Sequence, residues 1–309
     1  MAVFFCPLPQ ETLLHLHGNN VSLFLQGQTT CDVRQANANV ALGGAHCNAQ
    51  GRVLADFLLL APASDHILLR LRQSIAIPSM ANLAKYAAFS RVKVEQAEDW
   101  QVYACWGEDA ANTLAELTQI TWPQDRYRMH TGHGYYLLQL DDQGCEFELY
   151  LHREQGSAVL QALSRQCLPT SADDWQQKEQ ARGIARIEPS TIATFLPQAL
   201  SYDLAGLISF NKGCYTGQEV IARLHYRGKS KRRLFGATTQ TTSTPVAGDT
   251  LYTNSDKQAA GTVVNVVATD KEQWQLLLSL ATQAALEEVH LYNTDGPLLQ
   301  LSEPPFGIH

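Results

Sequence analysis

The stretch from Lys212 to Glu219 contains residue types that can do chemistry together. It reads Lys-Gly-Cys-Tyr-Thr-Gly-Gln-Glu and brings a thiol, an ammonium and two glycines into eight residues. Cys214 precedes an expected helix, at the positive end of its dipole, and Lys212 is two residues away. Both features favour thiolate over thiol. Cys214 is therefore the candidate reactive or ligating cysteine, with Lys212 beside it in the catalytic set.

The helix itself is predicted from a capping signal. Thr216 and Glu219 have the S/T-x-x-E spacing of a capping box, which predicts a helix from about Gly217 to Leu224. Gly213 and Gly217 permit positive φ and the close approach of another group to the backbone. The alternative interpretation is a glycine-bracketed turn in which Cys214 is a small buried filler.

The eight-residue stretch resembles the signature of the YgfZ family, folate-binding proteins related in fold to the T-protein (aminomethyltransferase) of the glycine cleavage system. A mitochondrial branch of that family serves iron–sulfur protein maturation. The resemblance implies tetrahydrofolate or a derivative as bound ligand, no tightly bound metal, and support of iron–sulfur enzymes, including tRNA-modifying ones. It also implies thiol or cluster chemistry at Cys214 and a motif role for Gly213, Tyr215, Thr216, Gly217, Gln218 and Glu219.

Further positions match the folate-binding elements of this family. Gln28 and Thr29 lie in a polar turn that resembles a G-Q-x-T element near the folate cavity, although a helix C-cap followed by a loop fits the same residues. Arg186-Ile187-Glu188 matches an arginine-x-glutamate element, and a carboxylate at Glu188 can accept two N–H bonds from the aminopyrimidine edge of a pterin. Ion pairing of Glu188 with a nearby arginine is the alternative. Trp175 is a candidate stacking partner or a core residue.

The sequence departs from the aminomethyltransferases at one position of chemical importance. Those enzymes carry paired aspartates after an N-x-x-G-G hairpin, whereas Asn48-Ala49-Gln50-Gly51 is followed by Ala55 and Asp56. Alanine cannot transfer a proton, and Asp56 is expected on the opposite face of its strand. Glycine-cleavage activity is therefore not expected. A folate-dependent aminomethyl transferase stays as the alternative function, and a hydrolase or transferase with Cys214 as nucleophile as a third.

A basic segment follows the cysteine motif. Between Arg223 and Arg233 there are six lysines and arginines, one histidine and no acid. This pattern fits either a solvated face or an anion site for a polyglutamate tail or phosphate, and Arg223 and Arg227 are assigned to folate on the second interpretation. The net charge of -7 argues against a nucleic-acid-binding surface. We therefore expect no stable direct contact with nucleic acid.

Composition predicts the class of protein and its compartment. The 309 residues, 45% of them hydrophobic, predict two or three well-packed domains. The sequence has seven cysteines, and none of them are in a C-x-x-C pair. Their spacing therefore predicts neither a structural zinc site nor a site that holds an iron–sulfur cluster by itself. The N-terminus lacks a signal-peptide pattern, and no apolar run approaches the roughly 20 residues of a membrane helix. A cytoplasmic location without membrane partners is expected.

Periodicity and turn signals predict an α+β chain. A hairpin joins strands at 40–47 and 52–61, helices are expected at 20–27, 78–88, 109–117, 156–166 and 173–185, and short apolar segments after residue 234 predict a small antiparallel barrel. The family resemblance implies the T-protein cloverleaf, three domains around a central cavity. Its expected domains are 1–30 with 98–195, 31–97 with 196–233, and the barrel at 234–309.

Overall fold

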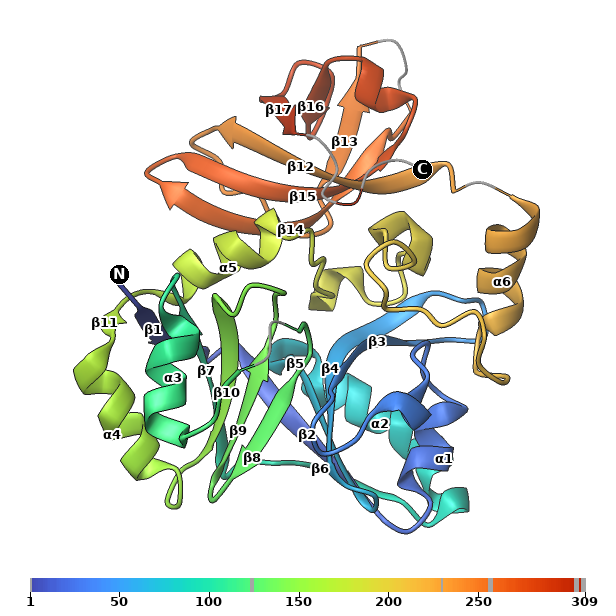
Figure 1. Ribbon diagram of the computed structural model, residues 1–309. Helices are drawn as coiled ribbons and strands as arrows, with labels where there is room; N and C mark the ends of the chain where they lie inside the picture. Colours follow the sequence, from blue (N-terminus) through green and yellow to red (C-terminus); the bar gives the residue numbers. More distant parts are fainter. Residues whose placement is uncertain (1, 123–124, 229, 255–257, 303–305, 307–309) are drawn as a thin grey trace. The chain divides into compact units, whose positions relative to one another are not determined.

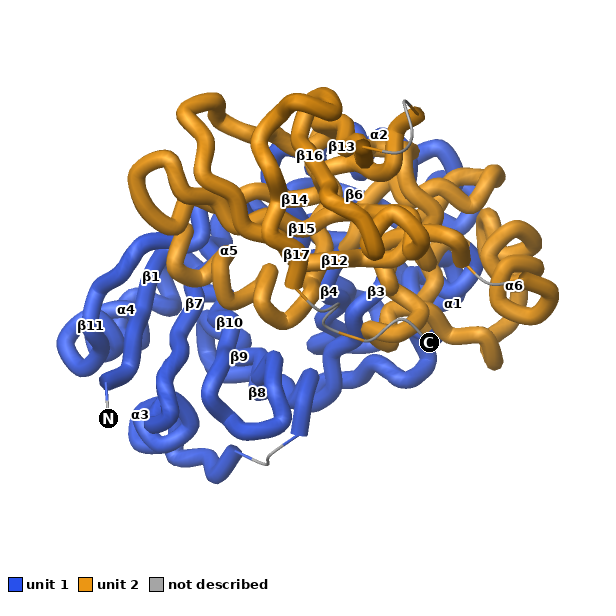
Figure 2. The backbone as a smooth tube through the Cα atoms, turned by 90° about the horizontal axis from the view of Figure 1, so that it is seen from above, with its two compact units in different colours: residues 1–27, 32–44, 57–172 blue, residues 28–31, 45–56, 173–309 orange. Residues whose placement is uncertain are grey.

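The computed structural model describes residues 2–122, 125–228, 230–254, 258–302 and 306 (Figure 1). Lys229 of the basic segment lies outside these residues. Helices and strands alternate along the chain, which confirms the α+β class. The chain divides into two compact units (Figure 2), unit 1 with residues 1–27, 32–44 and 57–172, and unit 2 with residues 28–31, 45–56 and 173–309. The three expected domains stay a prediction.

A six-stranded sheet forms one half of unit 1. Its strands run in the order β11-β1-β7-β10-β9-β8, and only β1 with β11 is a parallel pair within the described register. Apolar side chains of β1, β7 and β10 pack against α3 and α4, which lie on one side of the sheet (Figure 1). The bounds are β1 Phe4–Pro7, β7 Trp100–Trp106, α3 Ala110–Thr118, β8 Met129–Gly132, β9 Tyr135–Gln139, β10 Glu146–His152, α4 Ser157–Gln166 and β11 Leu168–Pro169.

A five-stranded sheet in the order β3-β4-β5-β2-β6 is the second sheet of the fold. Two of the boundaries between the units, at 44/45 and 56/57, fall within β3 and β4. The hairpin predicted at 48–51 joins these two strands, and the helix predicted at 20–27 is present as α1. The bounds are β2 Glu11–His17, α1 Val21–Gln26, β3 Leu42–Cys47, β4 Val53–Ala63, β5 His66–Arg72, α2 Ala76–Ala87 and β6 Lys93–Gln96.

Buried charges connect the two sheets of unit 1. Arg70 of β5 donates from Nε to Glu148 of β10 at 2.8 Å and from Nη1 to Glu11 of β2 at 3.3 Å. Arg72 donates to the other oxygen of Glu11 at 2.8 Å, and Tyr150 donates its hydroxyl to Glu148 at 2.7 Å. Two guanidinium groups thus face two carboxylates, which compensates charges that would be costly to bury alone.

The C-terminal strands close into a barrel, as the sequence predicts. They follow one another in the order β12-β15-β14-β13-β16-β17, and Phe235, Val263, Leu278 and Leu291 are among the side chains of its core. Closure leaves no long unpaired strand edge. The bounds are β12 Arg232–Gln240, β13 Thr250–Thr253, β14 Gly261–Asp270, β15 Gln273–Ala281, β16 Val289–Leu291 and β17 Leu298–Ser302.

Helix α5 precedes Glu188 in the chain, and helix α6 follows Cys214. Helix α5 covers Ala172–Ala181 and ends four residues earlier than predicted, because the chain turns at Gly183 with a φ of 73°. Helix α6 covers Gln218–Arg227 and extends beyond its predicted end. Short 3-10 helices at Pro189–Thr191 and Pro197–Leu200 follow α5. None of the helices in the described part of the chain is long and apolar enough to cross a bilayer.

Candidate functional site

Lys212 anchors the cysteine motif to a distant segment of unit 2. Its side chain is buried, and Nζ donates to the backbone oxygens of Thr29 at 2.6 Å and Cys31 at 2.7 Å. The same ammonium lies 5.0 Å from the centre of the Tyr215 ring. A buried ammonium is costly unless carbonyl dipoles replace its water. These contacts give Lys212 a role in holding the loop, whereas its predicted assistance to Cys214 stays a prediction.

Residues 28–31 are held between the motif and the end of β3. Thr30 donates its hydroxyl to Leu207 O at 2.7 Å and accepts from Ala45 N at 2.9 Å, while Ser209 N donates to Thr30 O at 2.9 Å. Thr216 of the motif approaches Gln28, with 3.5 Å between Oγ1 and Oε1. The structure therefore places the predicted folate residues Gln28 and Thr29 directly beside the cysteine motif.

Helix α6 begins with a different cap from the one predicted. Gly217 is its N-cap residue, in the left-handed region at φ 83°, and no side chain bonds there as a cap. Instead Gln218 accepts a hydrogen bond from Tyr215 N at 3.3 Å through Oε1. The capping box of Thr216 and Glu219 was the wrong expectation. The left-handed turn at Gly217 directs the chain so that Thr216 meets Gln28.

The two glycines of the motif have different environments. A Cβ on Gly217 would lie 2.5 Å from Asn48 O and 3.0 Å from the Cα of Gly51, so the 48–51 hairpin packs directly on the start of α6. Gly51 itself has a φ of 72°. A Cβ on Gly213 would meet no heavy atom within 4 Å. Close approach thus explains Gly217, and the same expectation for Gly213 was wrong.

Cys214 is exposed at the tip of this anchored loop. Cys145 is partly exposed, and the remaining five cysteines are buried. Burial raises the pKa of the Cys47 thiol to about 12, so that group stays protonated at neutral pH. The alternative of Cys214 as a buried filler is wrong, and Tyr215 fills the interior in its place with 7% of its surface exposed.

Arg186 is the buried centre of a second group of residues. Its Nε donates to Asp56 Oδ2 at 2.5 Å and its Nη1 to Glu179 at 3.1 Å. The other oxygen of Asp56 accepts from Ile187 N at 2.7 Å, and the Asn265 side chain bonds both the N–H and the carbonyl of Arg186. Both carboxylate oxygens of Asp56 therefore accept hydrogen bonds within this group.

Glu188 lines a cavity of about 580 Å³ between the 3-10 turn at 189–191 and the barrel strands β14 and β15. Asp173 and Trp274 line it too, with apolar side chains at 245–247 and 266–268.

Trp175 is fully buried and lies under the Arg182 guanidinium at 5.2 Å, which favours its interpretation as a core residue. Trp274 is the aromatic residue that lines the same cavity as Glu188. No local pattern marks it, because it is one of several apolar residues in a strand.

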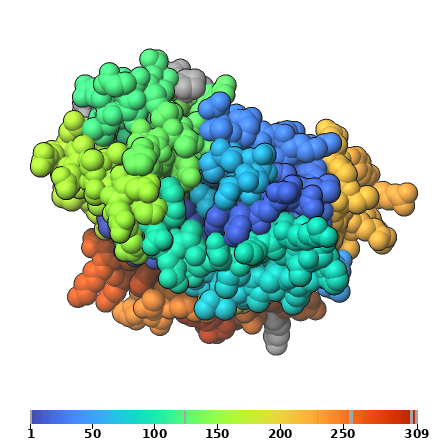
Figure 3. Space-filling model, turned by 90° about the horizontal axis from the view of Figure 1, so that it is seen from below, coloured from blue at the N-terminus to red at the C-terminus, as the bar shows by residue number. Residues whose placement is uncertain are grey.

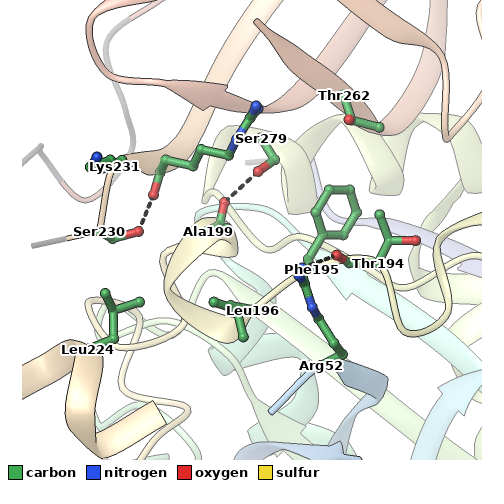
Figure 4. Close-up of a pocket in the computed structure, with 11 residues that line it drawn as sticks. Arg52, Thr194, Phe195, Leu196, Ala199, Leu224, Ser230, Lys231, Thr262 and Ser279 are labelled. Carbon is green, nitrogen blue, oxygen red and sulfur yellow. Dashed lines mark hydrogen bonds between the residues drawn. The ribbon is translucent and has the colours of Figure 1, made fainter. Parts of the chain in front are cut away.

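A second cavity, of about 530 Å³, has a basic lining (Figure 4). Arg52, Lys231 and Arg232 border it together with the Phe195 ring, and its lining contains no acidic side chain. Arg52 donates to Thr194 O at 2.6 Å and Arg232 to Ala260 O at 2.9 Å, so these two cations have fixed positions. Arg52 and Phe195 were missed in the sequence, where an arginine after a hairpin gives no functional signal.

The basic segment at 223–233 accordingly divides among three environments. Lys231 and Arg232 line the second cavity. Arg233 is buried and pairs with Asp203 at 2.8 Å. Arg223 and Arg227 are exposed on α6. Exposure of Arg223 and Arg227 fits a solvated face for that part of the segment. The anion site and the folate contacts of Arg223 and Arg227 stay predictions.

Comparison with known proteins gives consistent relatives. No protein-family model matches the chain. It is 33% identical to the tRNA-modifying protein YgfZ of Colwellia psychrerythraea, over 75% of this chain and 70% of that protein. It is 30% identical to the protein of the same name from Hamiltonella defensa (83% and 76% covered) and 29% identical to that from Yersinia pseudotuberculosis (84% and 79%).

One solved structure shows the fold. The glycine cleavage system aminomethyltransferase T from Bartonella henselae superposes with a TM-score of 0.78. The match covers 99% of this chain and 86% of that one, at 16% identity. The predicted T-protein-like fold class is therefore confirmed.

The two motif glycines provide a matched pair of substitutions. Gly217→Ala should lower the free energy of unfolding by about 1–3 kcal/mol from the left-handed backbone alone, and by more from the contact with Asn48. Gly213→Ala should change it by less than about 0.5 kcal/mol. Urea denaturation followed by tryptophan fluorescence measures both. Equal losses in the two variants would contradict the contact between the hairpin and α6.

Proposed function

Because the chain belongs to the YgfZ family, whose curated members are named tRNA-modifying proteins, we propose that it acts in tRNA modification as a folate-binding accessory protein of iron–sulfur enzymes. The main observation that supports this proposal is the exposure of the Cys214 side chain. The thiol is exposed on a loop that Lys212 ties to residues 29 and 31, at the head of α6. An exposed thiol on a held backbone is suited to transient contact with a client protein or its cluster.

The alternative, an aminomethyl transferase, is disfavoured by the state of Asp56. A carboxylate that assists one-carbon transfer must accept or orient a proton on the substrate. Both oxygens of Asp56 already accept bonds from Arg186 and Ile187, and its exposed fraction is 4%. The neighbouring Ala55 has no polar group. The shared fold with an aminomethyltransferase does not by itself imply this chemistry.

Folate binding is supported by the lining of the two cavities of unit 2. Glu188 offers a carboxylate and Trp274 a flat ring in the first, which suits the polar edge and the face of a pterin. Arg52, Lys231 and Arg232 in the second suit the carboxylates of the glutamate tail. Thr262 and Ala268, which line the two cavities, are about 20 Å apart along β14. An elongated ligand such as polyglutamylated folate fits that separation.

Glu188→Gln tests the pterin site. The loss of a charge-assisted hydrogen bond should weaken tetrahydrofolate binding by roughly 1.5–3 kcal/mol, or about 10- to 150-fold in Kd by titration calorimetry. Glu272→Gln, on an exposed turn of the same barrel, should keep the wild-type Kd. A loss in Asp173→Asn with none in Glu188→Gln would assign the pterin to the other carboxylate of the cavity.

Lys231→Gln tests the tail site. Polyglutamylated folate should bind wild type more tightly than the monoglutamate, and this advantage should fall about two- to fivefold in the variant. Added salt should reduce the same advantage, since the ammonium is exposed. Lys271→Gln, on an exposed turn of the barrel, should leave it unchanged. If Arg227→Gln alone removes the advantage, the tail lies along α6.

Cys214→Ala tests the proposed role itself. The variant should unfold within ~1 kcal/mol of wild type, because an exposed sulfur leaves no cavity, and it should keep its affinity for folate. In cells without the native gene it should fail to restore a cluster-dependent tRNA modification, measured by mass spectrometry of tRNA nucleosides. Cys145→Ala, which removes the partly exposed thiol, should complement. Full complementation by Cys214→Ala would contradict a chemical role for this thiol.

A further inference from the structure

Three imidazoles and a carboxylate meet on one face of the five-stranded sheet in unit 1. His15 and His17 are two residues apart on β2 and therefore point to the same side. Glu95 of β6 is directly opposite His15, and His66 of β5 is directly opposite His17. Directly opposed residues of antiparallel strands share a face. In Figure 3 the dark-blue N-terminal segment and the teal segment with β6 adjoin on the face that is seen.

The ligand atoms of this group are spaced for a metal ion. Glu95 Oε1 is 3.4 Å from His15 Nδ1 and 3.3 Å from His17 Nε2. A tetrahedral zinc ion with bonds of about 2.0–2.1 Å separates its ligand atoms by about 3.3–3.4 Å. One ligand atom from each of the three residues lies within 4.8 Å of the other two. Small rotations of the rings therefore suffice to bring all three onto one ion.

His66 and Asp65 orient the His15 ring. His15 Nε2 is 2.9 Å from His66 Nδ1, and the remaining nitrogen of His66 is 3.6 Å from the Asp65 carboxylate. A proton on His15 Nε2, donated to His66, leaves the lone pair of His15 Nδ1 directed at Glu95. Metal-binding histidines commonly donate their second ring N–H to a neighbour in this way.

The charges on this face are mixed. The carboxylates of Glu95 and Asp65 attract a cation, whereas Lys93, opposite His17 on β6, opposes one. The side chains of His15 and His17 are 25% and 27% exposed, so an ion from solvent can reach them. Imidazole and carboxylate ligands suit zinc, copper or nickel better than calcium or magnesium.

We propose that His15 Nδ1, His17 Nε2 and the Glu95 carboxylate bind one divalent transition-metal ion, for which zinc is the best fit, with His66 as a positioning residue. Three protein ligands leave a fourth position for water. The bound ion would join the edge strand β6 to β2. The site is independent of the folate and thiol proposals, because all of its residues belong to unit 1.

Calorimetric titration of the untagged full-length chain with zinc chloride tests the proposal. A Cys214→Ser background removes the exposed thiol as a competing ligand. We expect one zinc per chain, with the Kd raised at least tenfold in His15→Ala and in His17→Ala. His133→Ala, at an exposed turn of the same unit, should bind as the parent does. No saturable binding, or binding that the cluster variants leave unchanged, would overturn the site and leave a hydrogen-bonded histidine stack only.

Cobalt replaces zinc for a second readout that does not depend on affinity alone. Bound Co²⁺ should give the visible absorption of a four- or five-coordinate ion, and Glu95→Gln should change its shape because one oxygen ligand is altered. His66→Gln should keep the one-to-one stoichiometry and the spectrum but weaken binding about tenfold, as a positioning residue would. A purely octahedral, water-like spectrum, or an unchanged Kd in His66→Gln, would contradict this assignment.

Discussion

The buried guanidinium of Arg186 is the constraint on which the rest of unit 2 depends. A charge with 1% exposure must be compensated inside the protein, and the compensating groups come from separate segments. Asp56 lies in β4, Glu179 in α5, and Asn265, which bonds the backbone of Arg186, in β14. The side chain and the backbone of one residue therefore connect a strand, a helix and the barrel.

The same constraint limits the chemistry of the site. The carboxylate of Asp56 is used to neutralise Arg186. Lys212 is likewise used to hold the loop through two carbonyl oxygens. Cys214 is the exposed thiol on this loop. A fold shared at 16% identity can thus keep its architecture while the groups available for reaction change.

Unit 1 contains both a buried network of ion pairs and a partly exposed cluster of histidines with a carboxylate. Arg70 and Arg72 lie among Glu11 and Glu148, fully removed from water, and serve to hold two sheets together. The cluster at His15 is on an accessible face of the same strands, where the two histidines of β2 are about one quarter exposed. Accessibility and matched ligand spacing, and not the number of charges, distinguish a binding site from a structural network.

The sequence by itself determined the features that depend on local order. A helix near Gly217 was predicted from a capping signal, although its cap proved different. Short apolar segments predicted the barrel, turn residues predicted the hairpin at 48–51, and the eight-residue motif indicated the family and Cys214. Only the tertiary structure decided the cap of α6, since Gly217 is left-handed where it meets the hairpin. It alone joined Lys212 to Thr29, 183 residues apart. It also put Trp274, and not Trp175, in the lining of the cavity with Glu188, and it brought Glu95 next to His15. Local patterns record the face and period of one segment, whereas contacts between distant segments depend on how strands pair and which charges must be compensated.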